Sequence, residues 1–224
     1  MYIWIILIAV MVASFIIQRV LQSKFDKYSN VASPGGLTGA EVARLMLERN
    51  GIHDVQITCI EGKLTDHYDP RNSTINLSRE VYTGRSVSAC AVAAHETGHA
   101  LQHATGYGPL KVRSALVPVV TFANNTVQWV LLAGVLLVNL TPALLWLGIA
   151  LFAMTTFFSL ITLPVEINAS VRAVNWLSSE GVLDSTTKPM AADALKWAAY
   201  TYVIAAIGSL ATLLYYIAMA NGRR

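Results

Sequence analysis

The sequence is poor in charged residues and in cysteine, and each shortage excludes a class of protein. Only 13% of the 224 residues are charged, whereas 54% are hydrophobic, so a typical soluble domain is excluded. Cys59 and Cys90 lie far apart and form no CxxC pair, so neither a disulfide framework nor a cysteine zinc site is predicted. The net charge is only +3 and the basic residues are scattered, so we expect no nucleic-acid partner. The composition instead indicates a mainly α-helical integral membrane protein.

Four hydrophobic stretches are long enough, or nearly so, to cross a lipid bilayer, which requires about 20 helical residues. They cover residues 3–17, 116–138, 143–163 and 200–220. No basic residue precedes the first stretch, whereas Arg19, Lys24 and Lys27 follow it, and this order favours an uncleaved anchor over a signal peptide. The second and third stretches are joined by the turn signal Asn139-Leu140-Thr141-Pro142, which predicts a transmembrane hairpin.

The distribution of basic residues predicts the orientation in the membrane. Of the 16 Lys and Arg residues, only Arg223 and Arg224 lie outside residues 18–115 and 164–199, so the positive-inside rule places both segments in the cytoplasm. The predicted organisation is therefore an N-terminal transmembrane anchor (1–20), a cytoplasmic α+β region (21–114), a transmembrane hairpin (115–163), a second cytoplasmic segment (164–199) and a C-terminal transmembrane helix (200–224).

Local signals in the first polar region predict a small α+β fold. Thr38-Gly39-Ala40-Glu41 is a capping box that begins a helix, and Asn50-Gly51 ends it. Residues 55–60 and 74–77 have the composition of strands, and the segment 66–72 between them has the Asp, Pro and Asn residues of a turn. A second helix is predicted over residues 86–103.

The second predicted helix contains His95-Glu96-Thr97-Gly98-His99, which matches the HExxH motif. Residues i and i+4 lie one turn apart on a helix face, so the imidazoles of His95 and His99 can bind one zinc ion. Glu96 lies about 100° around the helix from His95, beside the position where a water molecule would bind the metal. The motif predicts a metallopeptidase in which Glu96 is the general base.

A catalytic zinc site usually has a third protein ligand, and Glu166 is the predicted one. It ends a charge-free stretch that begins after Arg113, and an isolated carboxylate at the end of a membrane helix is usually functional or paired. The predicted hairpin returns it to the membrane face that carries the motif. Pairing with Arg172 is the alternative. His103 lies about 12 Å along the helix from His95, too far to share one ion with it.

Further polar residues are candidates for supporting the site. Asn168 and Ser170 follow Glu166 closely and are candidates for orienting it or a ligand imidazole. His103 is a candidate for a similar supporting role or for a surface position. His67 is a candidate for polarising the scissile carbonyl, although a structural turn also explains the segment around it.

The predicted strand before the motif helix is a candidate for binding the substrate. Polar and apolar residues alternate from Thr74 to Ser78, and an extended peptide can add to an exposed strand at the edge of a sheet. We expect Ile75, Asn76 and Leu77 to form this edge. The alternative is an interior strand that is paired on both sides.

Together these features resemble the neutral zinc metallopeptidases of bacterial membranes, of the YugP type, within the gluzincin group. The resemblance extends over nearly the whole chain, and its most specific parts are residues 37–43, 64–70, 92–100 and 163–166. It implies a zinc-dependent endopeptidase of the bacterial inner membrane, with one Zn²⁺ per chain, a peptide or protein substrate, and a zincin-like cytoplasmic domain beside the lipid bilayer. The chain is more distantly similar to HtpX-type and CAAX-processing peptidases, whose late glutamate ligand is followed four residues later by an aspartate. Here Ser170 occupies that position.

Two other functions fit parts of the sequence. A site-2-type intramembrane protease also uses HExxH, but its motif lies in a hydrophobic span, and here Arg85 and Glu96 bracket too short an apolar run. The segment Val182-Leu183-Asp184-Ser185 only weakly resembles the aspartate motif of that class. A non-catalytic zinc-binding scaffold would normally surround the metal with four protein ligands, and the sequence offers three strong candidates.

Overall fold

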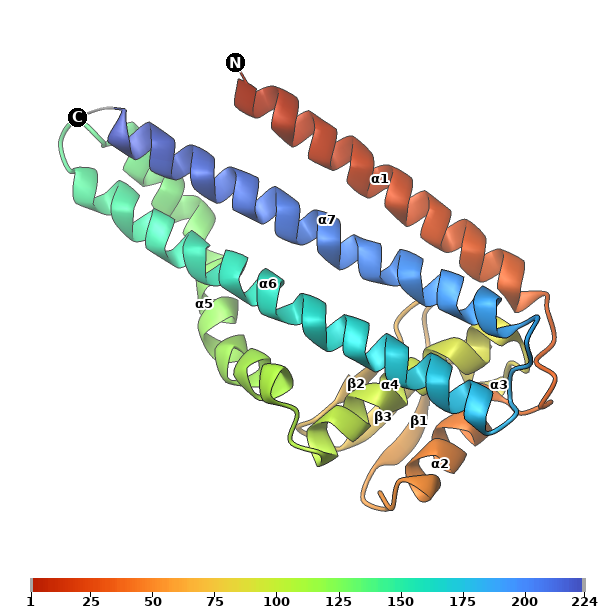
Figure 1. Ribbon diagram of the computed structural model, residues 1–224. Helices are drawn as coiled ribbons and strands as arrows, with labels where there is room; N and C mark the ends of the chain where they lie inside the picture. The colour runs from red at the N-terminus through yellow and green to blue at the C-terminus, as the bar shows by residue number, and fades with distance from the viewer. Residues whose placement is uncertain (1, 223–224) are drawn as a thin grey trace. The chain divides into compact units, whose positions relative to one another are not determined.

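The computed structural model describes residues 2–222, so Arg223 and Arg224 of the charge argument lie outside the described residues. The described chain is mainly helical, with one small sheet (Figure 1). Its helices are α1 (Tyr2–Ser29), α2 (Gly39–Arg49), α3 (Arg79–Thr83), α4 (Val87–Ala104), α5 (Gly108–Leu136), α6 (Pro142–Ser179) and α7 (Lys188–Asn221). Its strands are β1 (Gln56–Ile60), β2 (His67–Asp69) and β3 (Thr74–Ser78).

The chain divides into two compact units. The first contains the residues up to Ile16, Lys111–Pro164 and the residues from Thr201 onward. The second contains Ile17–Leu110 and Val165–Tyr200. Helices α1, α6 and α7 each contribute residues to both units, so the two polar segments of the chain are continuous with its apolar helices.

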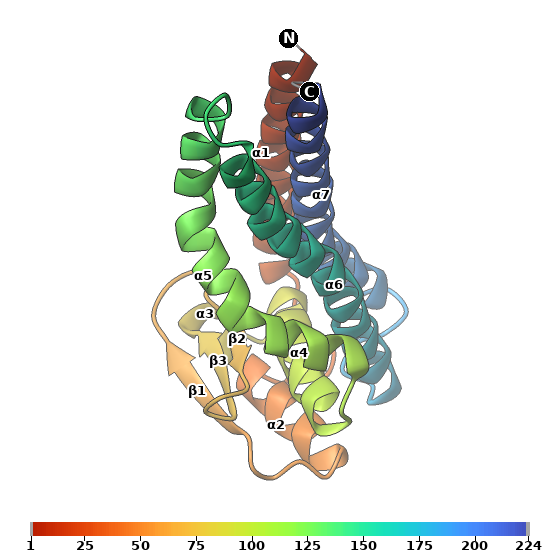
Figure 2. The ribbon, with the colours of Figure 1, turned by 90° about the vertical axis from the view of Figure 1, so that its left-hand side faces the viewer.

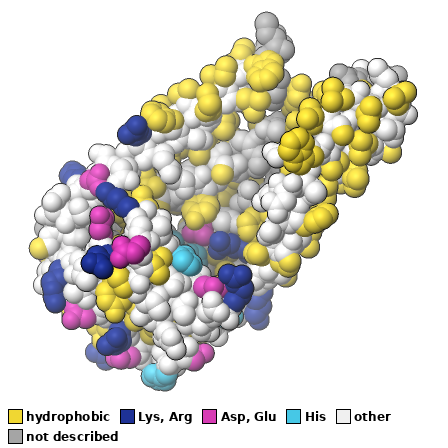
Figure 3. Space-filling model, turned by 180° about the vertical axis from the view of Figure 1, so that it is seen from behind, with side chains coloured by type: hydrophobic (Ala, Val, Ile, Leu, Met, Phe, Trp, Pro, Cys, Tyr) yellow, Lys and Arg dark blue, Asp and Glu magenta, His cyan; other side chains and the backbone are white. Residues whose placement is uncertain are grey.

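The first unit consists of long apolar helices with an apolar exterior. By length and composition, α1, α5, α6 and α7 can each cross a membrane. Trp4, Met11 and Trp129 expose more than half of their surface, and many hydrophobic side chains lie on the face of the long helices that Figure 3 shows. Large exposed apolar surfaces are rare on soluble monomers, so this exterior suits a lipid environment.

Helices α5 and α6 form the expected hairpin within the first unit. The chain turns at residues 137–141, where the Thr141 N–H donates to the Leu137 carbonyl, and α6 begins at Pro142, a favoured position for proline. A Cβ atom at Gly134 would lie 2.7 Å from Cα of Leu145. The glycine therefore permits close packing of the two helices.

The helical signals of the second unit are confirmed. Thr38 is the N-cap of α2 and forms the full capping box with Glu41, and Gly51 follows the helix with a φ of +68°, where the absence of a Cβ atom avoids strain. Ser86 is the N-cap of α4 and accepts a hydrogen bond from the Ala89 N–H. Both caps satisfy backbone donors that the first helical turn leaves unpaired.

The sheet has the strand order β1-β3-β2, with β1 parallel and β2 antiparallel to β3 (Figure 2). The predicted strands at 55–60 and 74–77 are confirmed as β1 and β3. The interpretation of 66–72 as a turn was wrong for His67–Asp69. These residues pair with β3 and therefore form the strand β2. The turn is confined to 70–73, immediately before β3.

The prediction that Ile75, Asn76 and Leu77 form an exposed sheet edge was wrong. They belong to β3, which is the middle strand and is paired on both sides. The reason is burial, because Ile75 and Leu77 have no exposed surface and β3 is the most buried of the three strands, as a central strand with neighbours on both sides is expected to be. The free edges of the sheet are β1 and β2.

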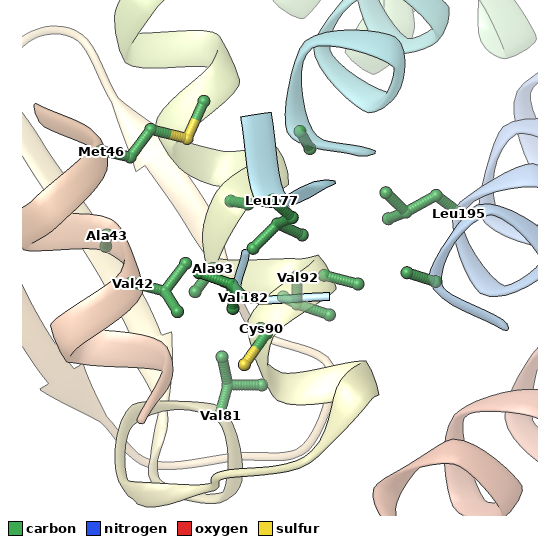
Figure 4. Packing of buried hydrophobic residues seen from close by; sticks show 14 of the residues in the cluster. Val42, Ala43, Met46, Val81, Cys90, Val92, Ala93, Leu177, Val182 and Leu195 are labelled. Carbon is green, nitrogen blue, oxygen red and sulfur yellow. The ribbon is translucent and has the colours of Figure 1, made fainter. Parts of the chain in front are cut away.

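A hydrophobic core joins α4 to α2 on one side and to the ends of α6 and α7 on the other. Figure 4 shows labelled core residues from these elements: Val42, Ala43 and Met46 of α2, Val81 of α3, Cys90, Val92 and Ala93 of α4, Leu177 of α6, Val182 of the connection to α7, and Leu195 of α7. Most are fully or almost fully buried. This packing holds α4 rigidly inside the second unit.

Candidate metal centre

Helix α4 contributes two imidazoles to a single point in the second unit. His95 and His99 lie one helical turn apart, and their ring centroids are separated by 4.8 Å. His99 is 8% exposed, and His95 is half-buried. The helix is surrounded by packed side chains and has few ways to move, so the two rings keep a fixed spacing.

Helix α6 approaches α4 at a glycine of the motif. A Cβ atom at Gly98 would lie 2.9 Å from the carbonyl oxygen and 3.3 Å from Cα of Ala169. Only a glycine at position 98 allows the two backbones to come this close without a shift. The contact brings the adjacent turn of α6, which carries Glu166, against the two imidazoles.

The donor atoms of His95, His99 and Glu166 all lie within 4.8 Å of one another. Oε2 of Glu166 is 3.3 Å from Nε2 of His95 and 3.5 Å from Nε2 of His99. Zinc bonds of about 2.0–2.1 Å at tetrahedral angles separate two donor atoms by about 3.3 Å, whereas a direct charged hydrogen bond is usually about 2.7–2.9 Å long. The spacing therefore fits a shared zinc ion.

The second nitrogen of each imidazole has its own partner. Nδ1 of His95 lies 3.1 Å from the Ser170 hydroxyl, and Nδ1 of His99 lies 3.0 Å from Oε1 of Gln102. Ligand histidines commonly have such a partner on the nitrogen that does not bind the metal. These contacts turn both Nε2 atoms toward Glu166.

The site favours positive charge at its centre. Burial opposes charging of the His99 imidazole, but the Glu166 carboxylate beside it outweighs burial, and Glu96 adds to its effect, so the pKa of His99 is raised above its ordinary value. A cation in contact with this carboxylate would be stabilised in the same way. The donor set and its electrostatics both match a divalent zinc ion.

Glu96 follows His95 directly in α4. Among the described residues, the cluster of possible metal ligands does not include it. Its side chain is 9% exposed, and its Oε2 accepts a hydrogen bond of 3.0 Å from the Tyr68 backbone N–H. Tyr68 is the middle residue of β2, an edge strand. The carboxylate therefore stands between the imidazoles and a free sheet edge.

The remaining predicted residues fall into two groups. Ser170 contacts a ring nitrogen of the site, and Asn168 is one residue removed from it, because its Oδ1 accepts from Gln102. His67 and His103 are exposed and lie outside the cluster. His67 interacts with Thr65 and Asn76, and Nδ1 of His103 lies 2.8 Å from the Tyr68 hydroxyl.

Sequence reasoning missed Gln102 and Gly98. Gln102 follows His99 by three positions and so lies on the same helix face, which was the signal available in the sequence. The role of Gly98 had no local signal, because it depends on the backbone of Ala169 in a distant helix.

Comparison with known proteins identifies the family of the chain. A family described as "Putative neutral zinc metallopeptidase" matches residues 3–221. The chain belongs to this family. It is also 47% identical over 217 residues to "Putative membrane protease YugP" of Bacillus subtilis (strain 168), and the match covers 96% of each chain. No solved structure matches the chain. In this member of the neutral zinc metallopeptidase family, the cluster of His95, His99 and Glu166 is the candidate metal centre.

Proposed function

We propose that this chain is a zinc-dependent endopeptidase embedded in the bacterial inner membrane, with its active site on the cytoplasmic side. The observation that carries the proposal is the convergence of donor atoms from His95, His99 and Glu166 on one point. Family membership supports zinc and peptidase activity. The four apolar helices support the membrane location, with residues 21–114 and 164–199 in the cytoplasm.

In this proposal the three donors would hold one zinc ion, and a catalytic site of this kind has a fourth position for water or substrate. When bound, zinc supplies Lewis acidity toward the water and the scissile carbonyl. Glu96 then accepts the proton of the attacking water and passes it to the leaving amine. Its hydrogen bond from Tyr68 holds the carboxylate beside the donors and not among them. This separation suits a base better than a fourth ligand.

The substrate would bind along β2 and not along β3. Strand β2 is paired only with β3, and its Tyr68 N–H already points to Glu96. An extended peptide added to the other side of β2 would donate to the Tyr68 carbonyl, because Glu96 already occupies the Tyr68 N–H, and such a main-chain hydrogen bond depends little on the sequence of the peptide. Such binding is typical of an endopeptidase with broad sequence tolerance.

The structure gives less support to the two alternatives. A site-2-type protease would need an aspartate ligand, but Oδ1 of Asp184 accepts hydrogen bonds from Thr186 and Thr187 in the turn before α7. Helix α4 is not among the candidate membrane spans of the described chain. A structural zinc site would need a fourth ligand, and the described residues provide a cluster of three.

The test is to measure zinc content and peptide hydrolysis on the same purified protein in detergent. Wild type should contain about one zinc per chain and cleave fluorescein-labelled casein. Glu96→Gln should retain the zinc and lose at least about 100-fold in turnover, because the amide cannot accept the proton. Glu48→Gln, which changes an exposed carboxylate of α2, is the matched control. Cleavage by a zinc-loaded Glu96→Gln protein at the wild-type rate would refute the mechanism.

A further inference from the structure

Gln102 is a fully buried polar residue beside the candidate metal centre. Its side chain has no exposed surface, and it makes three polar contacts. Oε1 lies 3.0 Å from Nδ1 of His99, and Nε2 lies 2.8 Å from the Val165 carbonyl oxygen and 3.0 Å from Oδ1 of Asn168. A buried amide with every contact occupied has a fixed orientation.

The contacts of Gln102 determine which end of its amide faces His99. The carbonyl of Val165 can only accept a hydrogen bond, so the Gln102 nitrogen must face it. Oδ1 of Asn168 also accepts from Nε of Arg172 over 2.8 Å, and a guanidinium can only donate. Oδ1 of Asn168 is therefore a second acceptor beside the side-chain nitrogen of Gln102. The Gln102 oxygen is therefore the atom that faces the imidazole.

The orientation of Gln102 favours one tautomer of the ring. A carbonyl oxygen can only accept, so Gln102 favours a neutral His99 with its hydrogen on Nδ1. Nε2 then keeps its lone pair for a metal, whereas in the absence of a metal the Glu166 carboxylate that faces Nε2 favours a hydrogen there. Ser170, the partner of His95, is different, because a hydroxyl can donate or accept and imposes no tautomer.

We propose that Gln102 is a positioning residue that holds His99 in the Nδ1–H tautomer, so that Nε2 is ready to bind the metal. The proposal rests on the proposed zinc site, but the preference that Gln102 gives to the ring can be measured without zinc once the Glu166 carboxylate is removed. Gln102 also joins α4 to the Val165 carbonyl, one residue before Glu166. It therefore aligns one ligand and anchors the helix segment that carries another.

The proposal distinguishes Gln102 from a glutamate of the same shape. A carboxylate at position 102 would accept from His99, but its second oxygen would face the Val165 carbonyl and Oδ1 of Asn168, which are both acceptors. Two buried acceptors in contact cannot satisfy each other. Both Gln102→Glu and the similarly sized Gln102→Met should therefore disturb the site, the first by repulsion and the second by loss of all three contacts.

The direct test is ¹⁵N NMR of histidine-labelled, metal-free Glu166→Ala protein at alkaline pH, so that no carboxylate competes for a hydrogen on Nε2. The His99 signals, assigned with a His99→Gln variant, should show the Nδ1–H tautomer in Glu166→Ala and a mixture when Gln102→Met is added. Hydrogen on Nε2 of His99 in the Glu166→Ala protein would overturn the proposal. The measurement needs no zinc, so it remains informative if the proposed function fails.

The second readout is zinc affinity, measured by competition with a chromophoric chelator. Gln102→Met should weaken zinc binding by about 10–100-fold, the usual effect of removing the hydrogen-bond partner of a ligand. Ser170→Ala, which removes the corresponding partner of His95, should change the His95 signals and leave the His99 tautomer unchanged. A folded Gln102→Met protein with wild-type zinc affinity and a pure Nδ1–H tautomer would also overturn the proposal.

Discussion

The backbone N–H of Tyr68 donates a hydrogen bond of 3.0 Å to Oε2 of Glu96. This bond connects an edge strand of the sheet to the candidate general base. It uses a donor of β2 that is not used by β3, and it orients a carboxylate that is otherwise buried. Tyr68 therefore belongs to an outer strand of the sheet and also orients the candidate general base.

We predict that proline has opposite effects in the two strands. Tyr68→Pro removes the N–H that orients Glu96, so casein cleavage should fall about tenfold or more while zinc is retained, and because edge strands tolerate proline the melting temperature should fall only by the loss of the Tyr68 ring from the core. Asn76→Pro lies in the middle strand and should lower the melting temperature sharply and lose zinc. Tyr68→Ala loses the same ring but keeps the N–H to Glu96, so it is the control. Equal melting temperatures for the two proline variants would contradict this.

Removal of Glu166 should release the metal. Glu166→Ala leaves two imidazoles where three donors met, so zinc occupancy after dialysis should fall well below that of wild type, and activity with it. Glu166→Gln keeps the volume and removes the charge, and should also lose zinc. Zinc content is measured by atomic absorption beside the Glu48→Gln control. Full zinc occupancy in Glu166→Ala would show that the third ligand is another residue.

A single methyl group at position 98 should separate α4 from α6. Gly98→Ala would bring its Cβ to 2.9 Å from the Ala169 carbonyl oxygen, and backbone in a packed core moves only at a cost of about 1–3 kcal/mol. Both melting temperature and zinc affinity should fall. Gly108→Ala is the matched control, because no atom lies within 4 Å of a Cβ there. An unchanged zinc affinity in Gly98→Ala would show that the close approach is not needed.

The zinc proposal requires the two polar segments to be on one side of the membrane. With Cys59 and Cys90 replaced by serine and alanine, single cysteines at Glu61 and Ser179, which are both exposed, should react with a membrane-impermeant maleimide only after the cytoplasmic side is opened. A cysteine at Asn139, in the turn between α5 and α6, should react from the outside. Labelling of positions 61 and 179 from opposite sides would exclude a joint site.

Asp184, in the turn before α7, should make the stability of the folded protein depend on pH. Hydrogen bonds from the Thr186 hydroxyl and from Thr187 lower the pKa of Asp184 from 3.8 to about 2. The folded state thus binds this proton more weakly, so the stabilisation is complete above pH 3.8 and is lost as pH falls through about 2. Asp184→Asn resembles the protonated side chain. The difference in melting temperature between metal-free wild type and this variant should therefore shrink at low pH, and a constant difference would contradict the prediction.

The sequence alone determined the features that depend on neighbouring residues. The capping box at Thr38, the cap at Ser86 and the spacing of His95 and His99 each involve positions within about one helical turn. Such interactions form wherever the helix forms. The apolar stretches likewise needed only composition and length, and Glu166 was identifiable because it ends the long charge-free stretch that begins after Arg113.

Only the tertiary structure decided which distant residues meet. His95 and Glu166 are 71 positions apart, and their contact depends on Gly98 lying against Ala169 and on α6 continuing as a helix beyond Pro164. β3 became the middle strand because its buried side chains belong at the centre of the sheet, and β2 became a strand by pairing with it. Gln102 acquired its orientation from a carbonyl of another helix. These outcomes follow from packing and hydrogen-bond pairing between segments, which no local pattern in the sequence encodes.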